Sequence, residues 1–87
     1  MENTIGFIRN DIETIDLQIL NLLKERLDKI KIIGEYKKNN NLPIYDEERE
    51  KILMNRLKET NIIPSIYIEH LWTEIFFISR CIQKDNN

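Results

Sequence analysis

Residues 5–38 read IGFIRNDIETIDLQILNLLKERLDKIKIIGEYKK, and the spacing of their apolar residues decides the fold. Isoleucine and leucine recur every three or four positions, which is the period of an amphipathic helix. Gly34, the internal glycine, costs only about 1 kcal/mol relative to alanine in a helix interior. No proline occurs before Pro43, so we expect one helix from about Ile5 to about Lys38.

Two shorter helices are expected in the rest of the chain. One should begin near Asp46, whose carboxylate can cap free backbone amides, and end near Thr60. Pro64 fits the first turn of the other, in which apolar residues recur at helical spacing from Ile68 to Ile82. The sequence has no strand pattern, internal repeat or interdomain linker, so we expect one all-helical domain over residues 1–87.

The length of the first helix bears on the number of chains in the molecule. About 34 residues at about 1.5 Å each span about 50 Å, whereas an 87-residue globule has a radius of gyration of only about 12 Å. One chain cannot cover the apolar stripe of such a rod. We therefore favour an intertwined homodimer of three-helix chains, with a monomeric bundle containing a broken first helix as the alternative.

Composition and charge narrow the class of function. Apolar residues make up 41 % of the 87 residues and charged residues 32 %, a balance that supports folding. Lys and Arg number 13 against 15 Asp and Glu, so no sequence-wide basic field favours nucleic acid as a partner. One cysteine, no membrane-length apolar run and no signal peptide pattern favour the cytoplasm, away from a membrane.

Two cations interrupt the apolar stripe of the first helix. Arg26 and Lys37 are eleven residues apart, or three helical turns, so they point the same way with roughly 16 Å between their α-carbons. Either residue alone could extend its charged head into water. For the two together, flanked by Ile30 and Ile33, a solvated pair and a binding site are both open; a buried pair of cations would need anions, which a dicarboxylate ligand would supply.

Polar residues also gather on the other two expected helices. Ser79 and Gln83 lie four residues apart on one face of the third helix, where a solvated helix end is the alternative explanation. On the second helix Asp46, Arg49 and Glu50 share one face, and a surface ion-pair cluster is the more common meaning of such a group. Neither pattern predicts a site by itself.

Arg9 bears on how a site would be assembled. It lies seventeen residues before Arg26, about 25 Å along a straight helix, which is too far for both to hold one small ligand within a chain. If Arg9 is functional, it must serve the site of a partner chain. An isolated surface arginine is the alternative.

Taken together, these patterns resemble one known family. The motifs are Arg9-x6-Asp16, Leu22-Leu23-x-Glu25-Arg26, Ile33-Gly34-x2-Lys37, Pro43-Ile44-x-Asp46-x2-Arg49-Glu50 and Ser79-x3-Gln83. In order and spacing, from about Ile8 to Gln83, they resemble the all-helical, AroQ-type (type II) chorismate mutases. The resemblance implies a helical homodimer and an isomerase that converts chorismate into prephenate in the biosynthesis of phenylalanine and tyrosine.

The resemblance also implies which residues bind the reacting part of the substrate. Arg26 and the Arg9 of the other subunit would bind the two substrate carboxylates. Lys37 and Gln83 would be the catalytic pair, which donates hydrogen bonds to the ether oxygen. Negative charge grows on that oxygen as the C–O bond breaks, so donors aimed at it would accelerate the reaction.

Four further residues would complete the site by the same resemblance. Glu50, with the backbone at Asp46, would receive the ring hydroxyl, and Arg49 and Ser79 would complete the polar wall. The reaction needs no nucleophile, metal or redox cofactor, so none is expected.

Two other functions stay open at this point. Isochorismate pyruvate lyase activity occurs on the same helical scaffold with a similar cationic site. A non-catalytic helical dimerisation or regulatory module is the third possibility. His70 and Cys81 lack partner motifs, and we interpret them as packing or surface residues rather than a nucleophile or zinc ligands.

Overall fold

The computed structural model describes residues 3–85, and nearly all of them lie in three helices. α1 spans Thr4–Asn39, α2 spans Glu47–Glu59 and α3 spans Ser65–Asp85. No strand occurs within residues 3–85, so the expected all-helical class is confirmed. The outermost residues of the expected domain, 1–2 and 86–87, lie outside the described part. Within that part, no helix combines the length and apolar character needed to cross a membrane.

α1 is one unbroken helix of 36 residues, within one residue of its predicted limits at both ends. Its last turn is closed by Asn40, whose backbone N–H and side-chain amide both donate to the carbonyl of Tyr36, at 3.0 and 2.8 Å. The chain then reverses at Asn41, which has a φ of 56°. The N–H of Leu42 donates to the carbonyl of Lys37 at 2.8 Å. The alternative of a broken first helix is therefore wrong.

α2 begins where the sequence predicts. The carboxylate of Asp46 accepts a hydrogen bond from the backbone N–H of Arg49 at 3.0 Å, which caps the helix. Acidic side chains occupy the first turn of α2, where they complement the positive end of the helix dipole. At the other end the hydroxyl of Thr60 donates to the carbonyl of Leu57 at 2.6 Å, and the chain turns at Asn61 with a φ of 55°.

Pro64 precedes α3 by one residue. The prediction that it belongs to the first turn is wrong by that one position, because the helix begins at Ser65. The carbonyl of Pro64 accepts from the N–H groups of Tyr67 and Ile68 at 3.0 and 3.4 Å. Pro64 thus supplies the first acceptor of the helix without needing an N–H of its own.

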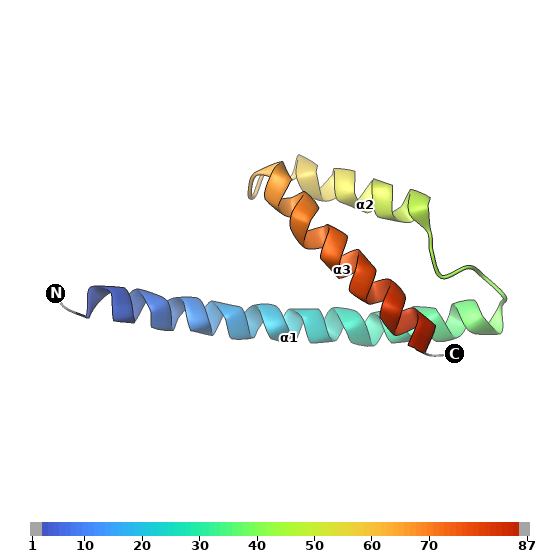
Figure 1. Cartoon of the computed structure of the whole chain (residues 1–87), viewed down its shortest axis with the longest axis horizontal. Helices are drawn as coiled ribbons and strands as arrows, with labels where there is room; N and C mark the ends of the chain where they lie inside the picture. Colours follow the sequence, from blue (N-terminus) through green and yellow to red (C-terminus); the bar gives the residue numbers. More distant parts are fainter. Residues whose placement is uncertain (1–2, 86–87) are drawn as a thin grey trace.

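α3 packs against both α1 and α2 and connects them (Figure 1). α2 and α3 lie over the C-terminal part of α1, and the N-terminal part of α1 extends beyond them. The molecule measures 60 × 26 × 15 Å and has a radius of gyration of 16.7 Å, well above the roughly 12 Å of a compact globule of this size. The predicted rod is therefore present in the single chain.

The core of the single chain is small. Among residues 3–85 the buried apolar side chains are Ile68 and Phe76, and the buried polar ones are Ser79 and Gln83. All four lie on α3. In contrast, the N-terminal part of α1 exposes a stripe of isoleucines to water, at Ile5, Ile8, Ile12, Ile15 and Ile19. Because apolar surface gains about 25 cal/mol per Å² on burial, a stripe of this length favours contact with another surface.

Candidate active site

A cavity of about 300 Å³ opens where the C-terminal half of α1, the segment before α2, the start of α2 and the last turns of α3 meet. Its walls are apolar at several points and charged or polar at others. The lining residues are Arg26, Ile30, Ile33, Lys37, Ile44, Asp46, Arg49, Glu50, Leu53, Phe76, Ser79, Arg80 and Gln83.

Seven of the eight predicted site residues line this one cavity. Arg26 and Lys37 come from one face of α1, together with Ile30 and Ile33, as the three-turn spacing predicts. The other five predicted residues in the wall come from the start of α2 and the end of α3, and they are Asp46, Arg49, Glu50, Ser79 and Gln83. Residues up to 57 positions apart in the sequence thus surround a common space.

Arg9 is the predicted residue that the chain does not bring to the cavity. It is exposed and lies on the part of α1 that extends beyond α2 and α3. This placement agrees with the distance estimate, by which one chain cannot present Arg9 and Arg26 to the same small ligand.

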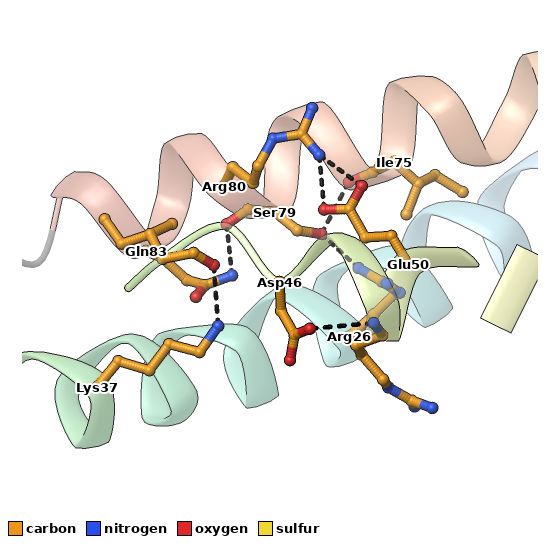
Figure 2. Close-up of polar contacts among 10 residues, drawn as sticks. Arg26, Lys37, Asp46, Glu50, Ile75, Ser79, Arg80 and Gln83 are labelled. Carbon is orange, nitrogen blue, oxygen red and sulfur yellow. Dashed lines mark hydrogen bonds and ion pairs between the residues drawn. The ribbon is translucent and has the colours of Figure 1, made fainter. Parts of the chain in front are cut away.

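Arg26 is joined to α3 through Ser79. Its Nη1 donates to Oγ of Ser79, and that hydroxyl donates to the carbonyl of Ile75 at 2.7 Å (Figure 2). Burial lowers the pKa of the Arg26 guanidinium, and the positive charge of Arg49 lowers it further. The two guanidinium groups therefore repel each other across a partly dehydrated space, which an anionic ligand would relieve.

Lys37 closes the other end of the cavity. Its Nζ donates to the carbonyl of Ile44 at 2.9 Å, which ties the end of α1 to the segment that leads into α2. An ammonium group has three donors, so this bond leaves capacity for a ligand. Figure 2 shows Lys37 and Gln83 directed toward each other from α1 and α3.

Gln83 is buried, and its amide is poorly satisfied. Nε2 donates to the carbonyl of Ser79 over 3.4 Å, a long bond within the same helix. Within residues 3–85, Oε1 is buried without a hydrogen-bond partner. A solvated helix end, the alternative explanation for Ser79 and Gln83, is therefore wrong. Unsatisfied buried polar groups are uncommon in proteins, and a catalytic role is one of the reasons for which they are kept.

The start of α2 contributes two carboxylates, Asp46 and Glu50, and one cation, Arg49, to the cavity wall. Asp46 caps the helix, as described above, and Glu50 forms an ion pair with Arg80 of α3, with its two oxygens 2.7 and 2.6 Å from Nη1. A surface cluster formed by Asp46, Arg49 and Glu50 among themselves is therefore not what the chain builds. Arg80 was missed from the sequence, although it directly follows Ser79 and lies one helical turn after Phe76.

The cavity carries an excess of positive charge. Four cationic side chains and two carboxylates line it, which leaves two positive charges without a carboxylate to balance them. Within residues 3–85 no group of three His, Cys, Asp or Glu residues could hold a metal ion. His70 and Cys81 are both exposed, in agreement with their interpretation as surface residues. The arrangement is suited to binding a small dianion and to donating hydrogen bonds to it.

Comparison with known proteins assigns the chain to a family. The family model for chorismate mutase type II matches residues 8–84. The chain belongs to the type II chorismate mutases. This match covers α2 and most of α1 and α3, including all eight predicted site residues.

Relatives of this family differ in length. A protein named chorismate mutase from Methanocaldococcus jannaschii is 39 % identical over 73 residues, which cover 79 % of this chain and 74 % of that protein. The bifunctional chorismate mutase/prephenate dehydratase of Aquifex aeolicus is 37 % identical over 84 residues, which are 90 % of this chain but only 23 % of that protein. The chain thus spans about a quarter of the bifunctional relative.

A solved structure has the same fold. It is described as a conserved hypothetical protein from Pyrococcus furiosus, and it superposes with a TM-score of 0.78 at 35 % identity. The match covers 92 % of this chain and 95 % of that one. The three-helix arrangement is therefore shared by a solved protein of nearly the same length.

Proposed function

We propose that this chain is an isomerase that converts chorismate into prephenate, a step in the biosynthesis of phenylalanine and tyrosine. The observation that carries the proposal is the cavity with two unbalanced positive charges beside the buried amide of Gln83. Chorismate has two carboxylates, so it matches the charge. The names of the relatives, one of them a chorismate mutase that this chain covers over 74 % of its length, support the same activity.

The reaction itself makes modest demands on a protein. One C–O bond breaks as one C–C bond forms within the same molecule, so atoms and electrons balance without a nucleophile, an oxidant or a proton donor. The protein has to hold the substrate in a compact, chair-like conformer. It also has to stabilise the negative charge that grows on the ether oxygen as the C–O bond breaks.

Lys37 and Gln83 stabilise the negative charge on the ether oxygen. They face each other across the cavity, and both keep donor capacity for a ligand. A single preorganised donor aimed at a developing oxyanion contributes on the order of 3 kcal/mol, or 10²-fold to 10³-fold in rate. Ile30 and Ile33 line the cavity beside these donors, and a lower local dielectric there would strengthen the contacts.

Two arginines hold the substrate in its compact conformer by binding its carboxylates. Arg26 binds one carboxylate, because a guanidinium grips a carboxylate at two points. The other carboxylate is bound by Arg9 of a second copy, which the exposed isoleucine stripe on α1 brings alongside. The assembly is thus an intertwined homodimer in which each site uses both chains.

The remaining polar residues fix the ring of the substrate. Glu50, with the backbone at Asp46, accepts the hydrogen bond of the ring hydroxyl. Arg49 and Ser79 complete the polar wall, and Ser79 also orients Arg26. A cytoplasmic location and the absence of nucleic acid and membrane partners remain predictions from composition.

A direct assay tests this proposal against isochorismate pyruvate lyase activity, which the same cationic cavity could also support. The purified protein is incubated separately with chorismate and with isochorismate, and the products are identified. We expect loss of the chorismate absorbance with prephenate as the product. Pyruvate and salicylate from isochorismate, without prephenate from chorismate, would overturn the proposal.

A further inference from the structure

Arg80 lines the cavity, but the proposed function gives it no role. Its Nη1 donates to both oxygens of Glu50, over 2.7 and 2.6 Å. The two side chains are 33 % and 22 % exposed, whereas the Lys24–Asp28 pair on α1 is 75 % and 53 % exposed. Solvent therefore screens the Arg80–Glu50 pair less than an ordinary surface ion pair, and its geometry is better defined.

The position of Arg80 is itself fixed from a second direction. Its guanidinium carbon lies 5.1 Å from the centre of the Tyr45 ring, within the range of a cation–π contact. Tyr45 belongs to the segment between α1 and α2 and directly precedes the helix cap Asp46. Arg80 therefore connects α3 to this segment and to the first turn of α2 at once.

Without Arg80, the side chain of Glu50 could turn away from the main cavity into a second one. Glu50 and Arg80 both border the main cavity and also a second, more open cavity of about 220 Å³. The ion pair is thus part of the wall between the two spaces. Glu47, one turn earlier on α2, pairs instead with Lys51 on its own helix, 3.3 Å away and exposed to solvent. The carboxylate of Glu50 is distinguished from its neighbour by the cation that α3 presents to it.

We propose that Arg80 is a positioning residue that holds the carboxylate of Glu50 in the wall of the main cavity, where it accepts the hydrogen bond of the substrate's ring hydroxyl. This inference rests on the proposed function. Each carboxylate oxygen accepts more than one hydrogen bond, so Glu50 can bind Arg80 and the hydroxyl at the same time. Arg80 acts through Glu50 and is not a catalytic residue.

The structure also predicts which substitution is tolerated. Both bonds to Glu50 come from one nitrogen of Arg80, so the single ammonium of a lysine could replace them if it reaches the carboxylate. A methionine has similar bulk but no donor. Arg80→Lys should therefore retain most of the activity, and Arg80→Met should lose it.

The test measures kcat/KM for the wild-type protein, Arg80→Met, Glu50→Gln and the double variant, with chorismate and with an analogue that has hydrogen in place of the ring hydroxyl. With chorismate we expect Arg80→Met to lose about 10-fold to 100-fold, since a misplaced binding group has effects of that size. With the analogue the loss should stay within about threefold. The double variant should be no worse than Glu50→Gln, because Arg80 acts only through that residue.

Lys58→Met is the matched control. It removes a different ion pair between α2 and α3, Lys58–Glu69 at 3.4 Å, whose residues do not line either cavity. It should leave kcat/KM unchanged for both substrates. Melting temperatures show whether Arg80→Met folds. If it does not, Arg80→Lys is tested in its place. Its activity with chorismate is expected to stay within about threefold of wild type.

Three results would overturn the role of Arg80. They are equal losses with chorismate and the analogue, additive losses in the double variant, and failure of Arg80→Lys to keep chorismate activity although it folds. A wild-type protein that does not convert chorismate would instead refute the proposed function, so the two failures can be told apart.

Discussion

Gln83 has the least satisfied polar group in the candidate site. Its side chain is buried, Oε1 has no partner within residues 3–85, and Nε2 has only a 3.4 Å bond to Ser79. In a protein whose buried amides are normally bonded, such a group is costly unless a ligand completes it. Oε1 is an acceptor and needs a donor, whereas Nε2, whose 3.4 Å bond is weak, is the atom that can donate to the ether oxygen of the substrate.

Gln83→Glu should make turnover depend on pH. A protonated carboxyl can still donate to the ether oxygen, whereas an ionised one repels the negative charge that develops there. Burial raises the pKa of an introduced carboxyl, so the protonated form persists into mildly acidic solution. We expect activity near the acid end of a pH 4–8 profile that declines on the order of 10²-fold toward neutral pH. Initial rates of chorismate loss across that range provide the measurement.

Gln83→Leu is the control, because it has no donor at any pH. It should be inactive across the whole profile. If Gln83→Glu instead kept wild-type activity at every pH, Gln83 would have no part in the chemistry.

Arg26 should favour substrate binding at the expense of stability. Its pKa is lowered by burial and by Arg49, so the charged form is less favourable in the folded state than in the unfolded one. Below the pKa of Arg26 the guanidinium is charged, so burying it lowers the stability of the folded chain by the full amount. Neutral pH lies in this range. Arg26→Met should therefore unfold at the same temperature as wild type or higher, and kcat/KM should drop on the order of 10²-fold or more.

Lys24→Met is the matched control on the same helix. Lys24 is 75 % exposed and pairs with Asp28 at 3.0 Å, so its loss should change neither melting temperature nor kcat/KM appreciably. Differential scanning calorimetry and steady-state kinetics give both quantities. Unchanged turnover in Arg26→Met would remove Arg26 from the substrate-binding site, whereas a wild-type protein without turnover would favour the non-catalytic helical module.

At the scale of the elements, the turn after α1 determines where the site closes. Asn41 adopts a left-handed conformation, with a φ of 56°, and the following segment brings the carbonyl of Ile44 to Lys37. Asparagine and glycine enter this region more easily than other residues. The turn therefore orders the wall of the cavity between α1 and α2.

Asn41→Ala should destabilise the chain by about 1 kcal/mol, and Asn41→Gly should be neutral or slightly stabilising, because only alanine is strained at this φ. Urea denaturation followed by circular dichroism measures both free energies of unfolding. Equal effects of the two substitutions would show that the backbone conformation at Asn41 does not limit stability.

The limits of the helices could be predicted from the sequence because their signals are local. The apolar period defines α1, Asp46 caps α2, and Pro64 marks the start of α3 to within one residue. The face of α1 that bears Arg26 and Lys37 follows from the same period. These features need no knowledge of how the helices pack.

The contact between Glu50 and Arg80 could not be predicted in the same way. The two residues are 30 positions apart, and their meeting depends on how α3 crosses α2, which no local pattern specifies. Sequence spacing suggested that Glu50 would pair within its own helix, if it paired at all. The burial of Ser79 and Gln83 likewise depends on the packing of α3 against its neighbours.

At the scale of the whole molecule, the single chain leaves the apolar stripe of α1 uncovered. α1 extends beyond the other helices and exposes its isoleucine stripe, and the overall length reaches 60 Å. Arg9 lies on that extension, away from the cavity. A second copy packed along α1 would cover the stripe and could bring its own Arg9 to the cavity, which is why the proposed site and the proposed homodimer belong together.

Subunit mixing tests this central claim most directly. Arg9→Ala and Arg26→Ala chains, each inactive alone, are unfolded together, reassembled and assayed for prephenate formation. Random pairing makes half of the dimers mixed, each with one intact site of two, so we expect turnover of about a quarter of the wild-type value. No recovery in a sample shown by mass spectrometry to contain mixed dimers, or sedimentation of the wild-type protein as a single chain, would contradict a chorismate mutase site shared between two copies.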